Sequence, residues 1–189
     1  MSVFSRDQPF ELLPDGSVAV ALRDEEFELL RQLPDELRNV YESPDPGDGV
    51  DPVRARLFPR AYLDPTEDRA EEEWQALVAP DLLRTRLDAL AAITGGLERA
   101  TRRRGRRVFT LEPDAVQQWL AVLNDARLAL GVRLEITEDT DYGRIDPDAP
   151  DAFGFAVYGW LSAFQGELLE ILLGDGSDPF DADPTDFRD

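Results

Sequence analysis

The chain contains no cysteine, no histidine and no lysine. The absence of cysteine excludes disulfides, thiolate metal sites and every thiol-based redox switch. The absence of histidine removes the usual proton carrier near neutral pH and the commonest zinc ligand. The absence of lysine excludes Schiff-base chemistry and the lysine of a P-loop. Only carboxylates, hydroxyls and arginine remain for catalysis, so we expect a protein that is not an enzyme and that uses no cofactor and no metal.

Positive charge is also scarce. The chain has 40 acidic and 20 basic residues, and its formal net charge is -20. A surface of this charge repels nucleic acids and anionic membranes unless it carries a local basic patch. The opening residues lack the pattern of a signal peptide, and the longest apolar stretch, residues 152–173, is interrupted by glutamine and glutamate. This stretch predicts a buried helix rather than a membrane span, and the expected location is the cytoplasm.

Length and apolar content suffice for one folded domain. The chain has 189 residues, of which 42% are hydrophobic, and this allows a substantial core without disulfides or metals. We expect a mainly α domain over residues 1–174, a bundle of about five helices with a small N-terminal β-hairpin or minor sheet. The hairpin is predicted over residues 10–22, with its turn at residues 14–16 and alternate residues from Val18 to Leu22 on one face.

Prolines divide the helical pattern of the first half. The first helix is predicted to have Asp24 as its N-cap and a kink or break at Pro34. Thr66 opens a second helix that reaches residue 78, and Asp81 opens a third with leucines at helical spacing. Two glycines at positions 95 and 96 weaken this third helix near its end.

The second half of the chain predicts two helices and two short strands. Residues 108–111 and 133–137 have the pattern of strands. Between them, Pro113 starts a fourth helix and Gly131 ends it. The last helix, residues 152–173, is apolar almost all round, so we place it at the centre of the bundle.

Two segments are expected to lack regular structure. A region rich in proline, glycine and aspartate predicts a flexible loop over residues 43–55. Residues 175–189 contain six aspartates and one arginine, and they predict a disordered acidic tail.

The most distinctive local feature is a run of five arginines within residues 102–107. In so acidic a chain the run would create a local positive field, and guanidinium groups pair bidentately with carboxylates and phosphates. It therefore predicts a contact with an acidic partner surface or with phosphate. The alternative is structural, with the run neutralised inside the chain or placed at the end of a helix. The candidate residues are Arg102, Arg103, Arg104, Arg106 and Arg107.

Three other groups of residues have a structural and a functional interpretation. Phe58 and Tyr62 either fill the core or expose an apolar patch to a partner. Acidic clusters such as residues 71–73 raise the possibility of a hydrolase that uses carboxylates and Mg²⁺ on nucleotides, although helix dipoles and solvent explain most of them. Within the fourth helix, the polar residues at 124, 125 and 127 stand among leucines and indicate a polar network that ties helices together.

Three segments resemble an actinobacterial family of domains of unknown function. They are RLFPRAY at 56–62, WLAVLNDARLALGVRL at 119–134, and the W-L-x-x-x-Q core of the last helix. The resemblance covers most of the chain, and the LNDxRLxLG string is its most specific part. The residues that match the family motifs, and that we expect to be structural, are Leu57, Pro59, Leu123, Asn124, Asp125, Arg127, Leu128, Gly131, Trp160 and Gln165.

The resemblance implies a regulatory function. Family members of the AosR type are oxidative-stress transcription regulators that work with an alternative sigma factor and respond through a cysteine pair. Genes of the family often lie near that of the proteolytic adaptor ClpS. This chain departs from the pattern because it has no cysteine. The interpretation is a non-enzymatic module that binds a protein, and the resemblance implies a sigma factor or a proteolytic adaptor. The alternatives are a DNA-binding protein that uses residues 102–107 and the nucleotide hydrolase.

Overall fold

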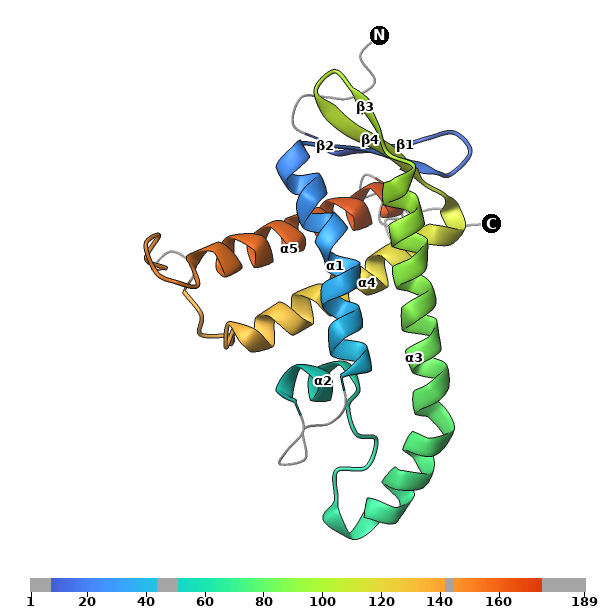
Figure 1. The fold of residues 1–189 in the computed structure, drawn as a ribbon, viewed down its shortest axis with the longest axis vertical. Helices are drawn as coiled ribbons and strands as arrows, with labels where there is room; N and C mark the ends of the chain where they lie inside the picture. Colours follow the sequence, from blue (N-terminus) through green and yellow to red (C-terminus); the bar gives the residue numbers. More distant parts are fainter. Residues whose placement is uncertain (1–7, 44–50, 142–144, 175–189) are drawn as a thin grey trace, which may run out of the picture.

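A computed structural model describes residues 8–43, 51–141 and 145–174. In these ranges it has five α-helices, one short 3-10 helix and four strands (Figure 1). The predicted fold class, mainly α with a minor sheet, is confirmed. The elements in chain order are β1 (Phe10–Leu12), β2 (Val18–Leu22), α1 (Asp24–Glu42), α2 (Pro52–Leu57), η1 (Pro65–Glu67), α3 (Asp68–Glu98), β3 (Thr101–Arg103), β4 (Arg106–Leu111), α4 (Pro113–Arg133) and α5 (Ala152–Leu173).

The sheet is antiparallel, with strand order β1-β2-β4-β3. Its first two strands form the predicted hairpin, and the Asp15 carboxylate accepts hydrogen bonds from the Ser17 backbone N–H (3.0 Å) and hydroxyl (2.6 Å) in the turn. The predicted strand 108–111 is the end of β4, which pairs with β2. All five residues of β2 are buried, whereas alternation was predicted for its apolar face. This strand lies between two others, and its two alanines need little cover.

Helix α1 is continuous through Pro34, so the predicted break does not occur. The proline ring lies on the buried side with Leu30 and Leu37, and this packing offsets the lost backbone hydrogen bond. The helix also begins at Asp24, which makes Arg23 the N-cap rather than the aspartate. The Glu26 carboxylate accepts the Arg23 backbone N–H at 2.8 Å.

Helix α3 corrects the prediction of two helices in this region. Thr66 lies in η1, and a single helix of 31 residues runs from Asp68 through Pro80 to Glu98. Pro80 is exposed, and so is Ala76, whose carbonyl loses its donor, so water can replace the missing bond. The glycine pair lies within α3 and does not end it, and Gly96 is buried beside Trp119, where an added Cβ atom would be at an ordinary contact distance of 3.5 Å from the ring.

The end of α4 also differs from the prediction. The helix passes Gly131 and ends at Arg133, and Glu135 takes the left-handed conformation (φ 52) that usually favours glycine. Residues 133–137 form no strand. Helix α4 starts directly after β4, and its 21 residues carry the chain about 30 Å, away from the sheet that a strand would have to join.

The central helix is α4 rather than α5. It contacts α1, α2, α3 and α5, and its Trp119 and Leu123 side chains are almost fully buried. Helix α5 packs on one side of α4 and against β1, and it leaves Phe153 71% exposed. The apolar composition of α5 thus did not indicate a central helix, because α5 is only partly buried. None of the helices in the three described ranges is long and apolar enough to cross a membrane.

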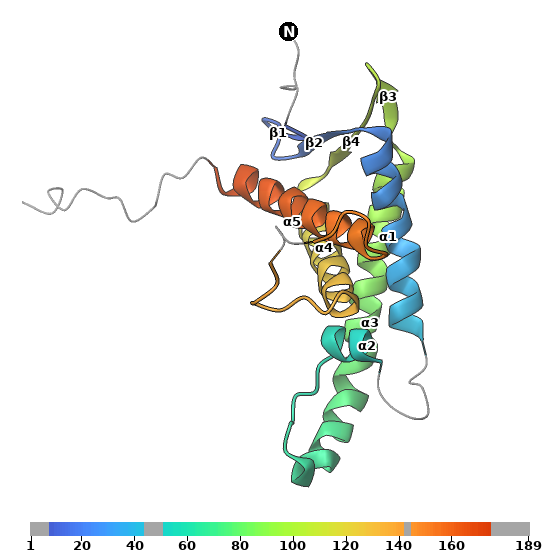
Figure 2. The same ribbon diagram turned by 90° about the vertical axis from the view of Figure 1, so that its left-hand side faces the viewer.

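Figures 1 and 2 show the resulting shape: the sheet caps one end, and α1 and α3 run lengthwise from it. The first half of α3 extends beyond α2 at the opposite end. Most of the predicted loop over residues 43–55 and all of the predicted tail over 175–189 lie outside the described residues. The end of that loop, residues 52–55, belongs to α2.

Candidate partner-binding surfaces

The arginine run forms a hairpin. Strand β3 pairs with β4, with Arg102 opposite Arg107 and Arg103 opposite Arg106. Both central residues of the turn have positive φ, 50° at Arg104 and 79° at Gly105. Such two-residue turns match the twist of antiparallel strands. Strand β3 was not predicted from the sequence, although an X-Gly pair between two short β-type runs is a recognisable signal.

Two of the arginines form ion pairs with another residue of the same chain. The Arg102 and Arg107 guanidinium groups pair with the Asp24 carboxylate at 2.5 and 3.0 Å, and Arg107 also lies 5.3 Å above the centre of the Phe27 ring. Asp24 stands in the first turn of α1, where the helix dipole favours an anion. These contacts fasten the hairpin to α1 and partly neutralise its charge.

The tip of the hairpin is different. Arg103 and Arg104 are exposed, and neither forms a hydrogen bond or ion pair with another residue in the described part of the chain. Arg106 donates a hydrogen bond from Nη1 to the Ala21 carbonyl at 3.2 Å. Figure 1 shows the hairpin projecting from the sheet at the end of the molecule farthest from the start of α3. The arginine run is therefore divided into an anchored base and a charged tip.

Phe58, the first of the two aromatic candidates, is half-buried in a cluster of cations. Its ring centre lies 4.7 Å from the Arg86 guanidinium and 5.0 Å from that of Arg54, and the ring stands nearly perpendicular to that of Tyr41. Contacts of this kind stabilise a desolvated arginine. The Phe58 ring is thus used within the protein.

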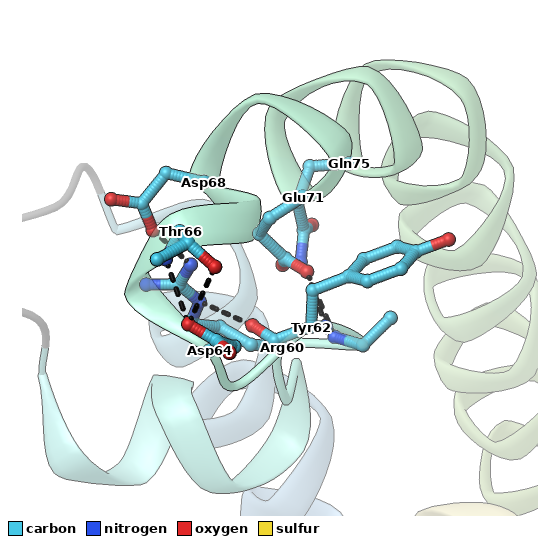
Figure 3. Close-up of polar contacts among 8 residues, drawn as sticks. Arg60, Tyr62, Asp64, Thr66, Asp68, Glu71 and Gln75 are labelled. Atoms are coloured by element: carbon cyan, nitrogen blue, oxygen red, sulfur yellow. Dashed lines mark hydrogen bonds and ion pairs between the residues drawn. The ribbon is translucent and has the colours of Figure 1, made fainter.

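The second candidate, Tyr62, lies in the loop that leads into α3 (Figure 3). The buried Glu71 carboxylate accepts the backbone N–H groups of Ala61 and Tyr62 at 3.0 and 2.9 Å, and it also accepts the Gln75 side chain at 2.6 Å. These donors favour the ionised form and hold the pKa of Glu71 below its ordinary range. Glu71, which the sequence showed only as one member of an acidic cluster, thus fastens the loop to the helix.

The same loop is also closed by exposed polar contacts. Arg60 pairs with Asp68 at 2.5 Å, and Asp64 accepts the Thr66 N–H at 2.9 Å to cap η1. Apolar side chains nearby remain uncovered in the structure, with Leu63 82% and Leu77 78% exposed. Polar contacts therefore hold the loop against the first half of α3, and the surface that the two form carries exposed apolar side chains.

One carboxylate of the family motifs ties three helices together. Asp125 of α4 accepts a hydrogen bond from the Tyr41 hydroxyl of α1 at 2.7 Å and from Nε of Arg86 of α3 at 2.7 Å. Burial raises the pKa of Tyr41, and the negative charge of Asp125 raises it further. Arg86 was not among the predicted residues, although its charge interrupts the leucine-rich pattern of α3.

A second polar group ties α4 to α5. Arg127 donates from Nε to the Ser162 hydroxyl at 3.0 Å and from Nη1 to the Gln165 side-chain oxygen at 2.8 Å. Trp160 stacks on Phe164 nearby. The structure thus gathers the three motif segments around α4. Among the remaining motif residues, Leu57 and Leu123 are buried, Leu128 and Gly131 are half-buried, and Pro59 and Asn124 are exposed.

Comparison with known proteins identifies the family. The profile of the family described as a domain of unknown function, DUF2017, matches residues 7–172. Proteins named oxidative stress regulator AosR from Mycobacterium tuberculosis and Mycobacterium bovis are 34% identical over 135 residues, 66% of this chain and 59% of each relative. A Mycobacterium leprae protein with AosR in its name is 30% identical over 153 residues, 81% of this chain and 61% of its own length.

The chain belongs to the DUF2017 family, which confirms the resemblance found in the sequence. It spans about three-fifths of the length of these relatives. No solved structure matches the chain.

Proposed function

We propose that this member of the DUF2017 family is a non-enzymatic regulator that acts by binding another protein through the tip of the β3–β4 hairpin. The observation that carries the proposal is the division of the arginine run. Asp24 engages Arg102 and Arg107, whereas Arg103 and Arg104 are exposed without a partner among the described residues. The names of the relatives support a regulatory role in oxidative stress.

The charge of the tip sets the chemistry of the partner. Two guanidinium groups on a fixed turn complement an acidic surface, and the rest of the chain, with a net charge of -20, repels one. The contact is therefore local and oriented by the tip. Of the partners implied by the family resemblance, we propose a cytoplasmic sigma factor or proteolytic adaptor that offers acidic residues to the hairpin. A cysteine switch has no part in it, because the chain has no cysteine.

Affinity purification from an actinobacterial lysate tests the proposal. The baits are the wild-type chain, the double variant R103S/R104N, and the control R69S/R84S. The control removes two exposed arginines from α3, so net charge changes equally in both variants. The asparagine preserves the turn, because Asn-Gly is favoured where both residues have positive φ.

We expect a sigma factor or adaptor to be recovered with the wild type and the control, and to be reduced at least about fivefold with the tip variant, since one exposed ion pair contributes up to about 1 kcal/mol. Equal recovery with all three baits would remove the tip as the contact. Recovery of no specific protein by any bait would contradict the proposed function itself.

DNA binding through the same tip is the second candidate, because guanidinium groups pair equally well with phosphate. If Arg103 and Arg104 each neutralise one phosphate, log K should fall with log salt by a slope of about 1.8. A filter-binding titration at low salt measures this slope. We expect no retention of DNA, because the net charge of -20 opposes it. Retention with this slope that is lost in R103S/R104N would favour DNA over protein as the partner.

A further inference from the structure

We infer that the hollow between α2, α4 and α5 is a binding site for a small organic anion, an oxyanion group joined to an apolar body. The hollow has a volume of about 360 Å³. Volumes of this order are typical of small-molecule sites, which combine apolar walls with a few convergent polar groups. It lies on a part of the molecule separate from the β3–β4 hairpin, so the inference does not depend on the proposed function.

The first polar group is Arg127, and its position is set by the protein. Nε and Nη1 are held by Ser162 and Gln165 of α5, and the guanidinium lies 5.8 Å from the Tyr158 ring. Its other terminal nitrogen, Nη2, has no hydrogen-bond partner among the described residues and is not a buried atom. Because Arg127 lines the hollow, this nitrogen can donate to a ligand without reorganisation of the side chain.

Arg56 of α2 and Asn124 of α4 supply two further donors. Both side chains line the hollow and are exposed, and neither has a hydrogen bond or ion pair with the chain as far as the structure describes it. By contrast, the neighbouring Arg54 is bonded to the Tyr41 carbonyl. Within the described ranges, Glu135 is the sole acidic residue that lines this hollow. In a chain of net charge -20, two arginines beside one glutamate favour an oxyanion, which guanidinium and amide groups bind with directed hydrogen bonds.

Most of the remaining wall is apolar, with Gly131 and Thr137 also at its edge. Its apolar groups are Leu128 and Val132 of α4, Ile136 after it and the Tyr158 ring of α5. A bare inorganic anion would leave these groups in contact with water, whereas an aromatic or branched body would cover them. The ligand class is therefore a carboxylate or a phosphate ester of modest size, and both present the same oxyanion chemistry to the donors.

An NMR titration of the ¹⁵N-labelled full chain at constant ionic strength tests the site. The probes are benzoate, phenyl phosphate and inorganic phosphate, and the amide signals followed are those of Gly131, Ile136 and Thr137. We expect saturable shifts with benzoate or phenyl phosphate, and the tighter of the two identifies the oxyanion. Inorganic phosphate should bind at least about tenfold more weakly, since burying one ring corresponds to about that factor. Equal binding of phenyl phosphate and inorganic phosphate would overturn the role of the apolar wall.

Matched variants locate the binding. R56Q removes an exposed charge from the hollow, so the fold is unaffected, and should weaken the better probe at least about fivefold. R69Q removes an exposed charge from α3, remote from the hollow, and should change the affinity less than about twofold. The inference is overturned if no probe gives saturable shifts up to about 10 mM, which would reveal Kd values near 1 mM. It is also overturned if the shifts centre on residues 102–107, or if R56Q binds like the wild type.

Discussion

Removal of the negative charge at Asp125 should strongly destabilise the fold. The Asp125 side chain is 9% exposed and its partner Arg86 is 19% exposed, so neither charge is well solvated. In D125N the shape is kept, but the Arg86 guanidinium loses its counter-ion. One of its nitrogens, Nη1, is already buried without a partner among the described residues. Breaking a buried pair in this way costs about 3–5 kcal/mol, and the residual exposure of Arg86 places the expected loss near about 3 kcal/mol.

Urea unfolding at pH 7 and 25 °C, followed by far-UV circular dichroism and tryptophan fluorescence, measures this loss. The matched control is D81N, which breaks the Arg84–Asp81 pair, where the side chains are 70% and 77% exposed. It should lower the free energy of unfolding by less than about 0.5 kcal/mol. The triple variant Y41F/R86M/D125L removes every polar member of the cluster and should recover part of the loss, because no charge is then left unpaired. A loss below about 1 kcal/mol for D125N, with an unchanged denaturant slope, would refute the reasoning.

Three further predictions test separate features. In E71Q an amide replaces the Glu71 carboxylate, whose pKa is lowered by the Tyr62 N–H first and by Gln75 next. The loop over residues 58–64 should therefore loosen, and trypsin should cleave after Arg60 faster than in wild type. In wild type the same loosening should appear only as the pH falls below the ordinary pKa of 4.5 and through the lowered pKa, because a carboxyl group with a lowered pKa stabilises the fold above that range. Unchanged cleavage would contradict the role of Glu71. The pKa of Glu167 is raised, by burial first and then by Glu170 and Glu26, so E167Q should raise the urea midpoint at pH 7 by the equivalent of less than about 1 kcal/mol. The gain should vanish below pH 4.5, where the Glu167 carboxyl is protonated in both the folded and the unfolded chain. A gain that persists there would have another cause. G105A should lower the free energy of unfolding by about 1–2 kcal/mol through the positive φ of 79° alone, since no described atom lies within 4 Å of the new Cβ. G159A has equally open space around the new Cβ but lies in a helix, so it should raise the free energy of unfolding by up to about 1 kcal/mol. The opposite order in urea unfolding would contradict this account.

Local sequence patterns were sufficient to predict secondary structure where neighbouring residues favoured the same conformation. The hairpin at 10–22 follows from turn residues between alternating apolar ones, and α5 keeps the predicted bounds because nothing interrupts its apolar run for long. Pro113 starts α4 as predicted, since the missing N–H has no helical partner at that position. The absence of three residue types also limits the possible chemistry, because folding can arrange side chains but cannot supply missing ones.

The candidate site was predictable only in its composition. Five arginines in six positions are visible in the sequence, but Asp24 lies 78 positions before Arg102, and no local pattern reports that they meet. The same holds for Asp125, whose partners Tyr41 and Arg86 come from two other helices. Exposure of Arg103, Arg104 and Arg56 is likewise a property of the assembled surface.

Composition, charge, the hairpin turn and the starts of α4 and α5 were thus determined by the sequence itself, because they depend on residues a few positions apart. The tertiary structure decided that Pro34 and Pro80 remain inside helices, because burial offsets one lost hydrogen bond and water can replace the other. It also placed α4 rather than the more apolar α5 at the centre, because position in a bundle depends on how many neighbours a helix can contact and not on its own hydrophobicity.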